Sequence, residues 1–444
     1  MRNKFLILLL VVATGYSVNA TARVNDTASV TPAAGEKMVL SLNEAQKYAI
    51  EHNKTLANAE IDVQKAEKAR WQALATMLPQ VSATFDYSNM CGYELNFGAM
   101  AIPMNPSGSL GVTASMTVSG AQVIALQISK ISEKMMNVAY LNNEQTICNQ
   151  VKTYYFSALI MHQTVGLLEK NLENIKNLAD QTAKSVKIGV AEQTDADKLM
   201  VQVATMQTTI SSTKRSLEMV YNAMRLQLGL PVDTEIELSQ TLDDLLNVEA
   251  ALALVSKDFI VDSNYNYQLL KYNTDITKKQ VDIAWWNHAP TITAFYQYSY
   301  KTYFGKEEGM NMTPPNAIGA SINIPIFSSW SRHSKLDEAR LAHQAQLNTL
   351  DDTRNSLLVQ HSQLKYNVSS AYDTYETQKQ NLEVNQRIFD KLSEKYEQGL
   401  SSSLEVTNSS SNLISAQSSF VQAVMELITA QIELENLLSN NNKE

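Results

Sequence analysis

Residues 396–406 read YEQGLSSSLEV and stand at the end of a long run of helical sequence. Upstream of them, mainly apolar side chains recur at alternating steps of three and four residues, which is the spacing of a coiled-coil seam. The seam contains Leu364, Val368, Ala371, Tyr375, Leu382, Phe389, Leu392 and Tyr396, with Gln378 and Asn385 at the two remaining core positions. Gly399 then interrupts the helical pattern, which resumes after it. The stretch therefore predicts the turn of a helical hairpin.

A second helical hairpin is predicted 210 residues earlier in the same register. Gly189 stands at its turn, where the later copy has Gly399. Its seam consists of Tyr154, Ala158, Met161, Val165, Leu168, Leu172, Ile175, Ala179, Thr182 and Val186. The chain therefore contains two copies of a coiled-coil hairpin.

Two further landmarks recur at nearly the same offset. Pro290 follows Pro79 by 211 residues, and Gly319 follows Gly111 by 208 residues. Self-similarity at a constant spacing indicates an internal two-fold repeat. The predicted division is a first repeat over residues 39–230, a connector over 231–262 and a second repeat over 263–438.

The composition favours a few long elements. The 444 residues include only 14 glycines and 9 prolines, well below the usual share of these helix breakers. Ser41 and Glu44 have the spacing of a capping box and predict one helix from there to Leu78, ended by Pro79. The net charge of −9 argues against nucleic acid as a partner.

Residues 1–20 have the pattern of a secretory signal peptide. Lys4 precedes an apolar run, small residues follow, and Ala20 is the expected cleavage position. The residue directly after that position is Thr21 rather than a cysteine, so we expect no amino-terminal lipid anchor. A flexible leader is predicted over residues 21–38 and a polar tail over 439–444.

Two β-hairpins are predicted, over residues 80–119 and 290–327. In each, apolar and polar side chains alternate, so that one face is apolar and the other polar. This pattern suits a transmembrane barrel with lipid outside and water inside, and it also suits the half-buried strands of a soluble sandwich. Because four strands cannot close a membrane barrel, a barrel would have to be shared between subunits.

Three tryptophans, Trp285, Trp286 and Trp330, fall at predicted junctions between helix and strand. Such positions suit aromatic side chains at a membrane surface, although core packing is the alternative. In the membrane reading, the loops over residues 91–107 and 305–315 would face the outside. The only cysteines, Cys91 and Cys148, are expected to lie far apart as separate thiols.

Several segments of the chain resemble one family. They are LSLNEAQKYAIEHN from Leu40, ALATMLPQVSATFDYS across Pro79, KIGVAEQTDADKL at the first tip, RLQLGLPVD, GASINIPIFSSWSRHSKLDEAR, and YEQGLSSSLEVTNSSSNLISAQ at the second tip. Together they resemble the TolC-like outer-membrane efflux proteins, also called outer-membrane factors. The resemblance implies a mainly α fold with membrane β: a homotrimer whose four strands per chain form a twelve-stranded barrel, and whose helical hairpins form a periplasmic α-barrel tunnel.

The same resemblance implies an entrance at the hairpin tips, ringed by acidic residues. Asp195 and Glu405 match the acidic positions, and Tyr396 matches an aromatic residue that holds the closed state. This chain departs from the family at Asn408, where a second acidic residue is expected, and at Ser401, where some members have a basic latch. The predicted site also includes the tip glycines and the junction prolines: Gly189, Gly399, Pro79, Pro290 and Pro325.

Alternatives remain for the two acidic residues. Asp195 lies three residues before Lys198, a spacing that suits an ordinary surface ion pair. No lysine or arginine lies within four residues of Glu405, so a role at the pore is the better interpretation there. Repeated around a pore, such carboxylates would favour cations.

The predicted function is an outer-membrane exit duct of a tripartite efflux or type I secretion system. The implied partners are two further subunits, a periplasmic adaptor at the tips, an inner-membrane pump acting through that adaptor, and outer-membrane lipid. No catalytic or nucleotide-binding motif occurs around the six histidines or elsewhere, so neither an enzyme nor a cofactor is expected. The alternative is a non-conducting periplasmic coiled-coil adaptor or structural stalk.

Overall fold

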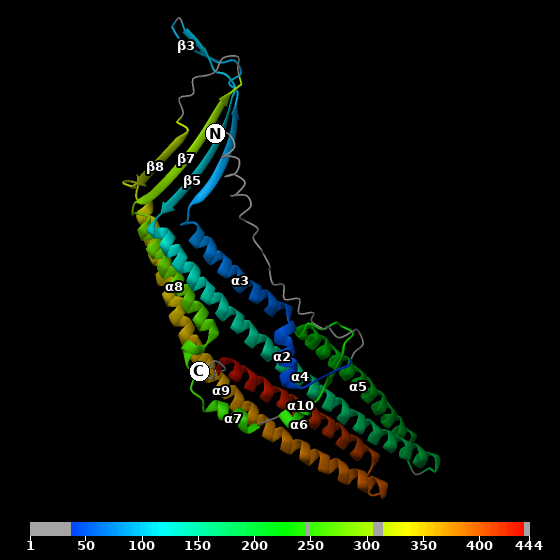
Figure 1. Cartoon of the computed structure of the whole chain (residues 1–444). Coiled ribbons are helices and arrows are strands. Elements are labelled where there is room, and N and C mark those ends of the chain that lie inside the picture. The colour runs from blue at the N-terminus through cyan, green and yellow to red at the C-terminus, as the bar shows by residue number, and fades with distance from the viewer. Residues whose placement is uncertain (1–36, 99, 190, 246–247, 305–313, 439–444) are drawn as a thin grey trace.

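A computed structural model describes residues 37–98, 100–189, 191–245, 248–304 and 314–438. The molecule is elongated, with a β-sheet at one end and two helix tips at the other (Figure 1). The predicted signal peptide, all but the last two residues of the leader, the tail and most of the loop over 305–315 lie outside the described residues.

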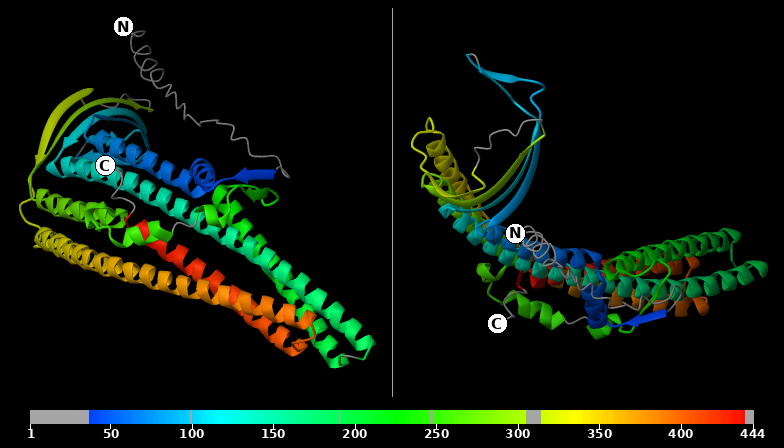
Figure 2. Two further views of the ribbon diagram at one scale, coloured as in Figure 1. Left: turned by 90° about the horizontal axis from the view of Figure 1, so that it is seen from below. Right: turned by 45° about the horizontal axis from the view of Figure 1, so that its top comes forward.

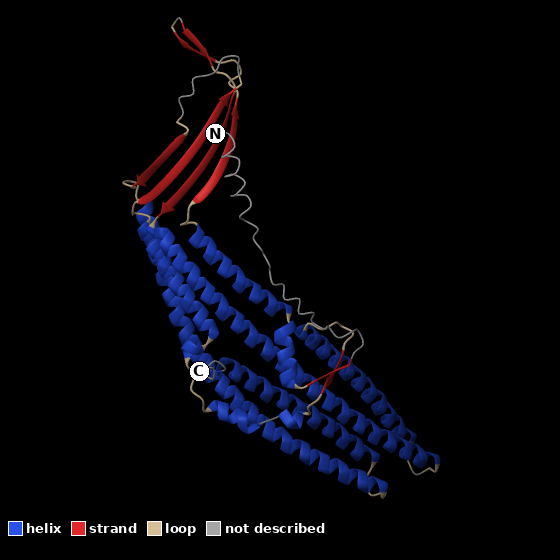
Figure 3. Ribbon diagram, in the orientation of Figure 1, coloured by secondary structure: helices blue, strands red, loops and turns tan. Residues whose placement is uncertain are grey.

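The sheet is built from four antiparallel strands in two neighbouring hairpins (Figure 3). Its order is β2 (Gln80–Ser88), β5 (Ser107–Val118), β7 (Thr291–Tyr303) and β8 (Asn316–Asn323). It is curved, as both views in Figure 2 show. The edge strands are β2 and β8, and among the described residues no further strand pairs with either.

One face of this sheet is apolar and uncovered in the single chain. The register places Phe85 beside Leu110 and Leu110 beside Tyr300, across three strands. Phe85 is 75% exposed, and Ile318 on β8 is 86% exposed. The predicted alternation of apolar and polar faces is therefore confirmed.

The polar face contains an aromatic residue, Phe295, that the sequence pattern did not assign to it. Thr117 and Thr293 share a hydrogen bond of 3.0 Å on this face, as the alternation predicts. Phe295 lies on the same face as Thr293 because side chains two residues apart on a strand share a face, and Gly319 opposite it leaves room for the ring. A Cβ atom on Gly319 would lie 2.7 Å from the Phe295 ring, so the ring covers the glycine.

The loop over residues 91–107 contains a further small hairpin, which the sequence did not predict. Strands β3 (Glu94–Phe97) and β4 (Met100–Pro103) pair antiparallel beyond the main sheet (Figure 1). Cys91 is exposed in this loop and Cys148 lies within a helix, and the two do not form a disulfide.

Two long helical hairpins extend away from the sheet. The first pairs α4 (Gly120–Lys187) with α5 (Gln193–Leu228), and the second pairs α9 (Ser331–Glu397) with α10 (Ser403–Leu438). The long arms have 68 and 67 residues and each return arm has 36, so the same succession of elements occurs twice. In the described part of the chain, no helix is long and apolar enough to cross a membrane.

The first helix is capped as predicted, but the prediction of one helix to Leu78 was wrong. Ser41 and Glu44 form the capping box, and the helix then divides into α2 (Leu42–His52) and α3 (Lys54–Ala75). The division falls at Asn53, whose side chain accepts hydrogen bonds from the first amides of α3. The same side chain donates to the Gln227 carbonyl of α5, at 2.8 Å. This tertiary contact favours two helices over one.

The connector lies part-way along the helices (Figure 1). It contains β6 (Glu235–Leu238), the short helices α6 (Leu242–Leu245) and α7 (Val248–Val255), and a 3₁₀ turn (Val261–Ser263) before α8 (Tyr265–Trp286). Strand β1 (Lys37–Leu40) pairs with β6 in parallel, so the last leader residues are ordered as a strand, which the sequence did not predict.

The largest apolar core lies where the connector meets the middle of the helices. Tyr155 of α4 is fully buried there, and its hydroxyl donates to the Leu40 carbonyl at 3.0 Å. The carboxyl-terminal half of α10 belongs to the same core through residues that include Leu427 and Leu434. This half of α10 is therefore held firmly, and the tips lie beyond the core.

Candidate functional site

Both hairpins turn at a glycine in the left-handed region of backbone conformation. Gly189 has φ +75° and Gly399 has φ +73°. At the second tip the Leu400 amide donates to the Lys395 carbonyl at 2.8 Å, which closes the end of α9 in a Schellman motif. A residue with a Cβ atom is strained in this conformation, and this explains a glycine at both tips.

A cleft of about 640 Å³ lies between the two tips. Asp195 and Glu192 line it from the first tip, and Tyr396, Ser401 and Leu404 line it from the second. The structure thus brings together three of the predicted entrance residues from distant parts of the sequence. The other two, Glu405 and Asn408, are exposed on the first turns of α10.

The Tyr396 ring packs beside Phe389 and Val406, and its hydroxyl contacts the other hairpin. This hydroxyl lies 2.7 Å from Oγ1 of Thr182, a fully buried residue of α4. The sequence placed both residues in coiled-coil seams but did not predict that they would meet. Tyr396 therefore links the two hairpins near their tips.

Glu405 caps its own helix, which the sequence analysis missed. Its carboxylate accepts hydrogen bonds from the Ser401 hydroxyl at 2.6 Å and the Ser402 amide at 3.0 Å. In return, the Ser402 hydroxyl accepts from the Glu405 amide at 3.3 Å. These bonds hold the pKa of the Glu405 carboxyl below its ordinary value. The bond from Ser401 lowers the pKa most, followed by the bond from the Ser402 amide. The Ser-x-x-Glu spacing was the available sequence signal.

Asp195 forms the ion pair that its sequence spacing suggested. Its carboxylate is half-buried in the first turn of α5, and the Lys198 Nζ lies 3.6 Å away. Because the Lys198 side chain is exposed to solvent, this ion pair contributes little to stability. Asp195 keeps its position at the cleft, where a negative charge also suits the helix N-terminus.

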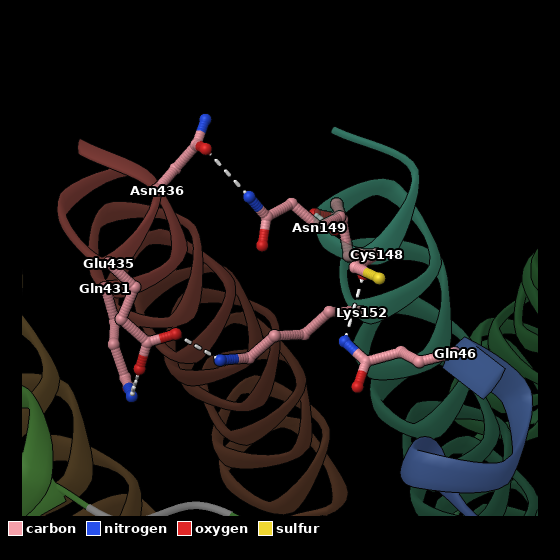
Figure 4. Close-up of polar contacts among 8 residues, drawn as sticks. Gln46, Cys148, Asn149, Lys152, Gln431, Glu435 and Asn436 are labelled. Atoms are coloured by element: carbon pink, nitrogen blue, oxygen red, sulfur yellow. Dashed lines mark hydrogen bonds and ion pairs between the residues drawn. The ribbon is translucent and has the colours of Figure 1, made fainter. Parts of the chain in front are cut away.

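A row of polar contacts joins α4 to α10, beginning beside the large core and continuing toward the tips. Lys152 and Asn149 of α4 face Glu435 and Asn436 of α10 (Figure 4). Gln46 of α2 approaches α4 from another side and donates to the Cys148 carbonyl (Figure 4). Periodicity within one helix does not reveal these contacts, because their partners are more than 100 residues apart.

Asn171 and Gln417 add a fully internal contact to this row. The Asn171 Nδ2 donates to the Gln417 Oε1 at 2.6 Å, and both side chains are only 7% exposed. The other described polar contacts between α4 and α10 lie at more exposed side chains.

The junction residues lie where helices meet the sheet. Pro79 precedes β2, Pro290 precedes β7 and Pro325 follows β8. Trp286 ends α8 and packs directly on Gly120, because a Cβ atom there would lie 2.1 Å from the indole ring. No group of three or more histidine, cysteine, aspartate or glutamate residues suited to a metal ion occurs within the described ranges.

Comparison with known proteins shows similarity along most of the chain. The family model described as outer membrane efflux protein matches residues 46–230 and 270–440. The outer membrane protein TolC of Escherichia coli (strain K12) is 21% identical over 424 residues, covering 92% of this chain and 83% of TolC.

Solved structures share the fold. The outer membrane protein VceC from Vibrio cholerae has a TM-score of 0.73 at 15% identity and covers 89% of this chain and 95% of VceC. The open state of the MtrE outer membrane channel from Neisseria gonorrhoeae has a TM-score of 0.72 at 15% identity, covering 89% of this chain and 88% of MtrE.

Proposed function

Because the chain belongs to the outer membrane efflux protein family, and so to the outer membrane of Gram-negative bacteria, we propose that it is a gated exit duct. It would carry cargo from the periplasm to the outside as part of a tripartite efflux or type I secretion system. The resemblance to TolC-like proteins implies three copies of the chain around one channel.

The observation that carries this proposal is the four-stranded sheet. Its apolar face is uncovered, and its edge strands β2 and β8 have unpaired outer sides among the described residues. An open sheet edge is not tolerated in lipid, whereas a closed barrel pairs every strand. Three copies joined through β2 and β8 would close a barrel of twelve strands, with the apolar face toward lipid.

The helical hairpins would then form the periplasmic tunnel. All six tips, two from each copy, would surround its entrance, with Asp195 and Glu405 adding negative charge there. A periplasmic adaptor would dock at the tips and connect the duct to an inner-membrane pump. Because the pump would select the cargo, this chain would act as a passive conduit.

A combined test uses the purified full-length protein. Electrophoresis before and after boiling should show a folded trimer that converts to a monomer. The same trimer in a planar lipid bilayer should conduct ions. A protein that fractionates as a soluble species and gives no conductance would instead support the periplasmic adaptor or stalk.

A further inference from the structure

The two hairpins contact each other in one continuous antiparallel register. Lys152 lies opposite Glu435, and Asn171 lies opposite Gln417. The two contacts are 19 residues apart along α4 and 18 residues apart along α10, which runs in the opposite direction. Along either helix this separation is about 28 Å at 1.5 Å per residue. A slide by one helical turn would break both contacts.

Gln417 lies at a boundary in the packing of α10. On its carboxyl-terminal side, Val424 belongs to the large core and Phe420 packs against that core. On its amino-terminal side, Ile414 packs against a separate cluster around Leu168 and Ile175, and Leu413 belongs to another cluster with Val406. The Asn171–Gln417 contact therefore separates the anchored half of α10 from the half that leads to the tip.

The chemistry of this contact differs from that of its apolar surroundings. A buried hydrogen bond between amides requires one geometry, so it specifies the register of two helices strongly. Its net contribution to holding them together is small, because both amides bind water when they separate. Two apolar side chains in the same place would hold the helices together more firmly and specify the register less.

We propose that Asn171 and Gln417 are positioning residues for the entrance and form a polar pivot, meaning the contact at which the tip half of the second hairpin begins to move away from the first. The pair selects one register when the tips are linked through Tyr396 and Thr182. It separates readily when that link opens, because water replaces the amide contact. This inference rests on the proposed channel function and assigns a pivot within it.

The test compares variants of the full-length trimer in planar bilayers and by amide hydrogen exchange of residues 403–420. The double variant Asn171→Leu/Gln417→Met keeps side-chain size and replaces the amide pair by an apolar one. It should reduce the frequency of opening by about tenfold and slow the exchange. The single variant Asn171→Leu leaves the Gln417 amide buried without its partner, so it should open more often and exchange faster.

Asn412→Leu is the matched control, because Asn412 is exposed on the same helix. It should match the wild type in both measurements. A double variant that opens as often as the wild type, even with a raised melting temperature, would make the pair merely structural and overturn the pivot. If the wild type forms no channel, the proposed function fails. In that case the amide hydrogen exchange still tests the pivot, because an unchanged exchange rate in the double variant would overturn it.

Discussion

The Tyr396 hydroxyl donates a hydrogen bond to Thr182 Oγ1 across 2.7 Å. The direction follows from Thr182, whose own hydroxyl proton is donated to the Leu178 carbonyl at 2.9 Å. Each residue lies within about two helical turns of its tip glycine, Gly399 or Gly189. One neutral hydrogen bond therefore joins the two hairpins next to the proposed entrance.

Removing this bond should favour opening. Tyr396→Phe keeps the ring in its apolar contacts and leaves Thr182 bonded to Leu178, so only the link is lost. The net value of one such bond is about 1 kcal/mol, which corresponds to about a fivefold higher ratio of open to closed states for each subunit of the channel. Single-channel recording measures that ratio. Tyr366→Phe, at an exposed position on the same helix, serves as the control, and unchanged gating in Tyr396→Phe would contradict the role of the link.

The start of α10 should depend on pH through Glu405. Its folded pKa is lowered from the ordinary value of 4.5, so the unfolded state binds the proton more tightly. The stabilising effect is therefore complete above that value and is lost as the pH falls through the lowered pKa. Protease cleavage at the second tip should accelerate in acid in the wild type.

In Glu405→Gln the same tip should be cleaved faster at neutral pH and should lose the acid dependence. Glu192→Gln is the control, because Glu192 precedes α5 without a side-chain bond to the helix backbone. Equal acid dependence in the wild type and Glu405→Gln would show that another group controls this helix end.

Negative charge at the tips should select cations. Replacing Glu405 by Gln should lower the preference for cations and weaken block by divalent cations, because three carboxylates leave the proposed ring. Asp195→Asn should have a smaller effect, since Lys198 already offsets its charge. Reversal potentials in asymmetric salt measure selectivity, with Asp62→Asn on α3 as a control remote from the tips. Unchanged selectivity and block in Glu405→Gln would exclude its contribution to the ring.

Two glycines of α4 should respond in opposite ways to alanine. In Gly120→Ala the new methyl group would lie 2.1 Å from the Trp286 ring, so the end of α8 must shift, at a cost of about 1–3 kcal/mol. Gly166 lies in the same helix with open space around it, so Gly166→Ala should stabilise by up to about 1 kcal/mol. Thermal unfolding of both variants gives the comparison, and a Gly120→Ala protein as stable as the wild type would contradict the packing of Trp286.

Local patterns predicted most of the fold correctly. The steps of three and four residues up to Tyr396 reflect the geometry of a single helix, and the tips at Gly189 and Gly399 follow from their backbone conformation. The cap at Glu405 was also local and was overlooked. The break at Asn53 was not predictable in this way, because its partner Gln227 lies 174 residues away.

The order of the long helices and of the four main strands and the apolar face of the sheet were thus already encoded in short-range periodicity, because each depends on neighbours within a few residues. The contacts that define the candidate site depend on packing between distant segments. Thr182 meets Tyr396 across 214 residues, and Asn171 meets Gln417 across 246. These pairs form only when two complete hairpins pack in one register, and that register depends on the shared core between them.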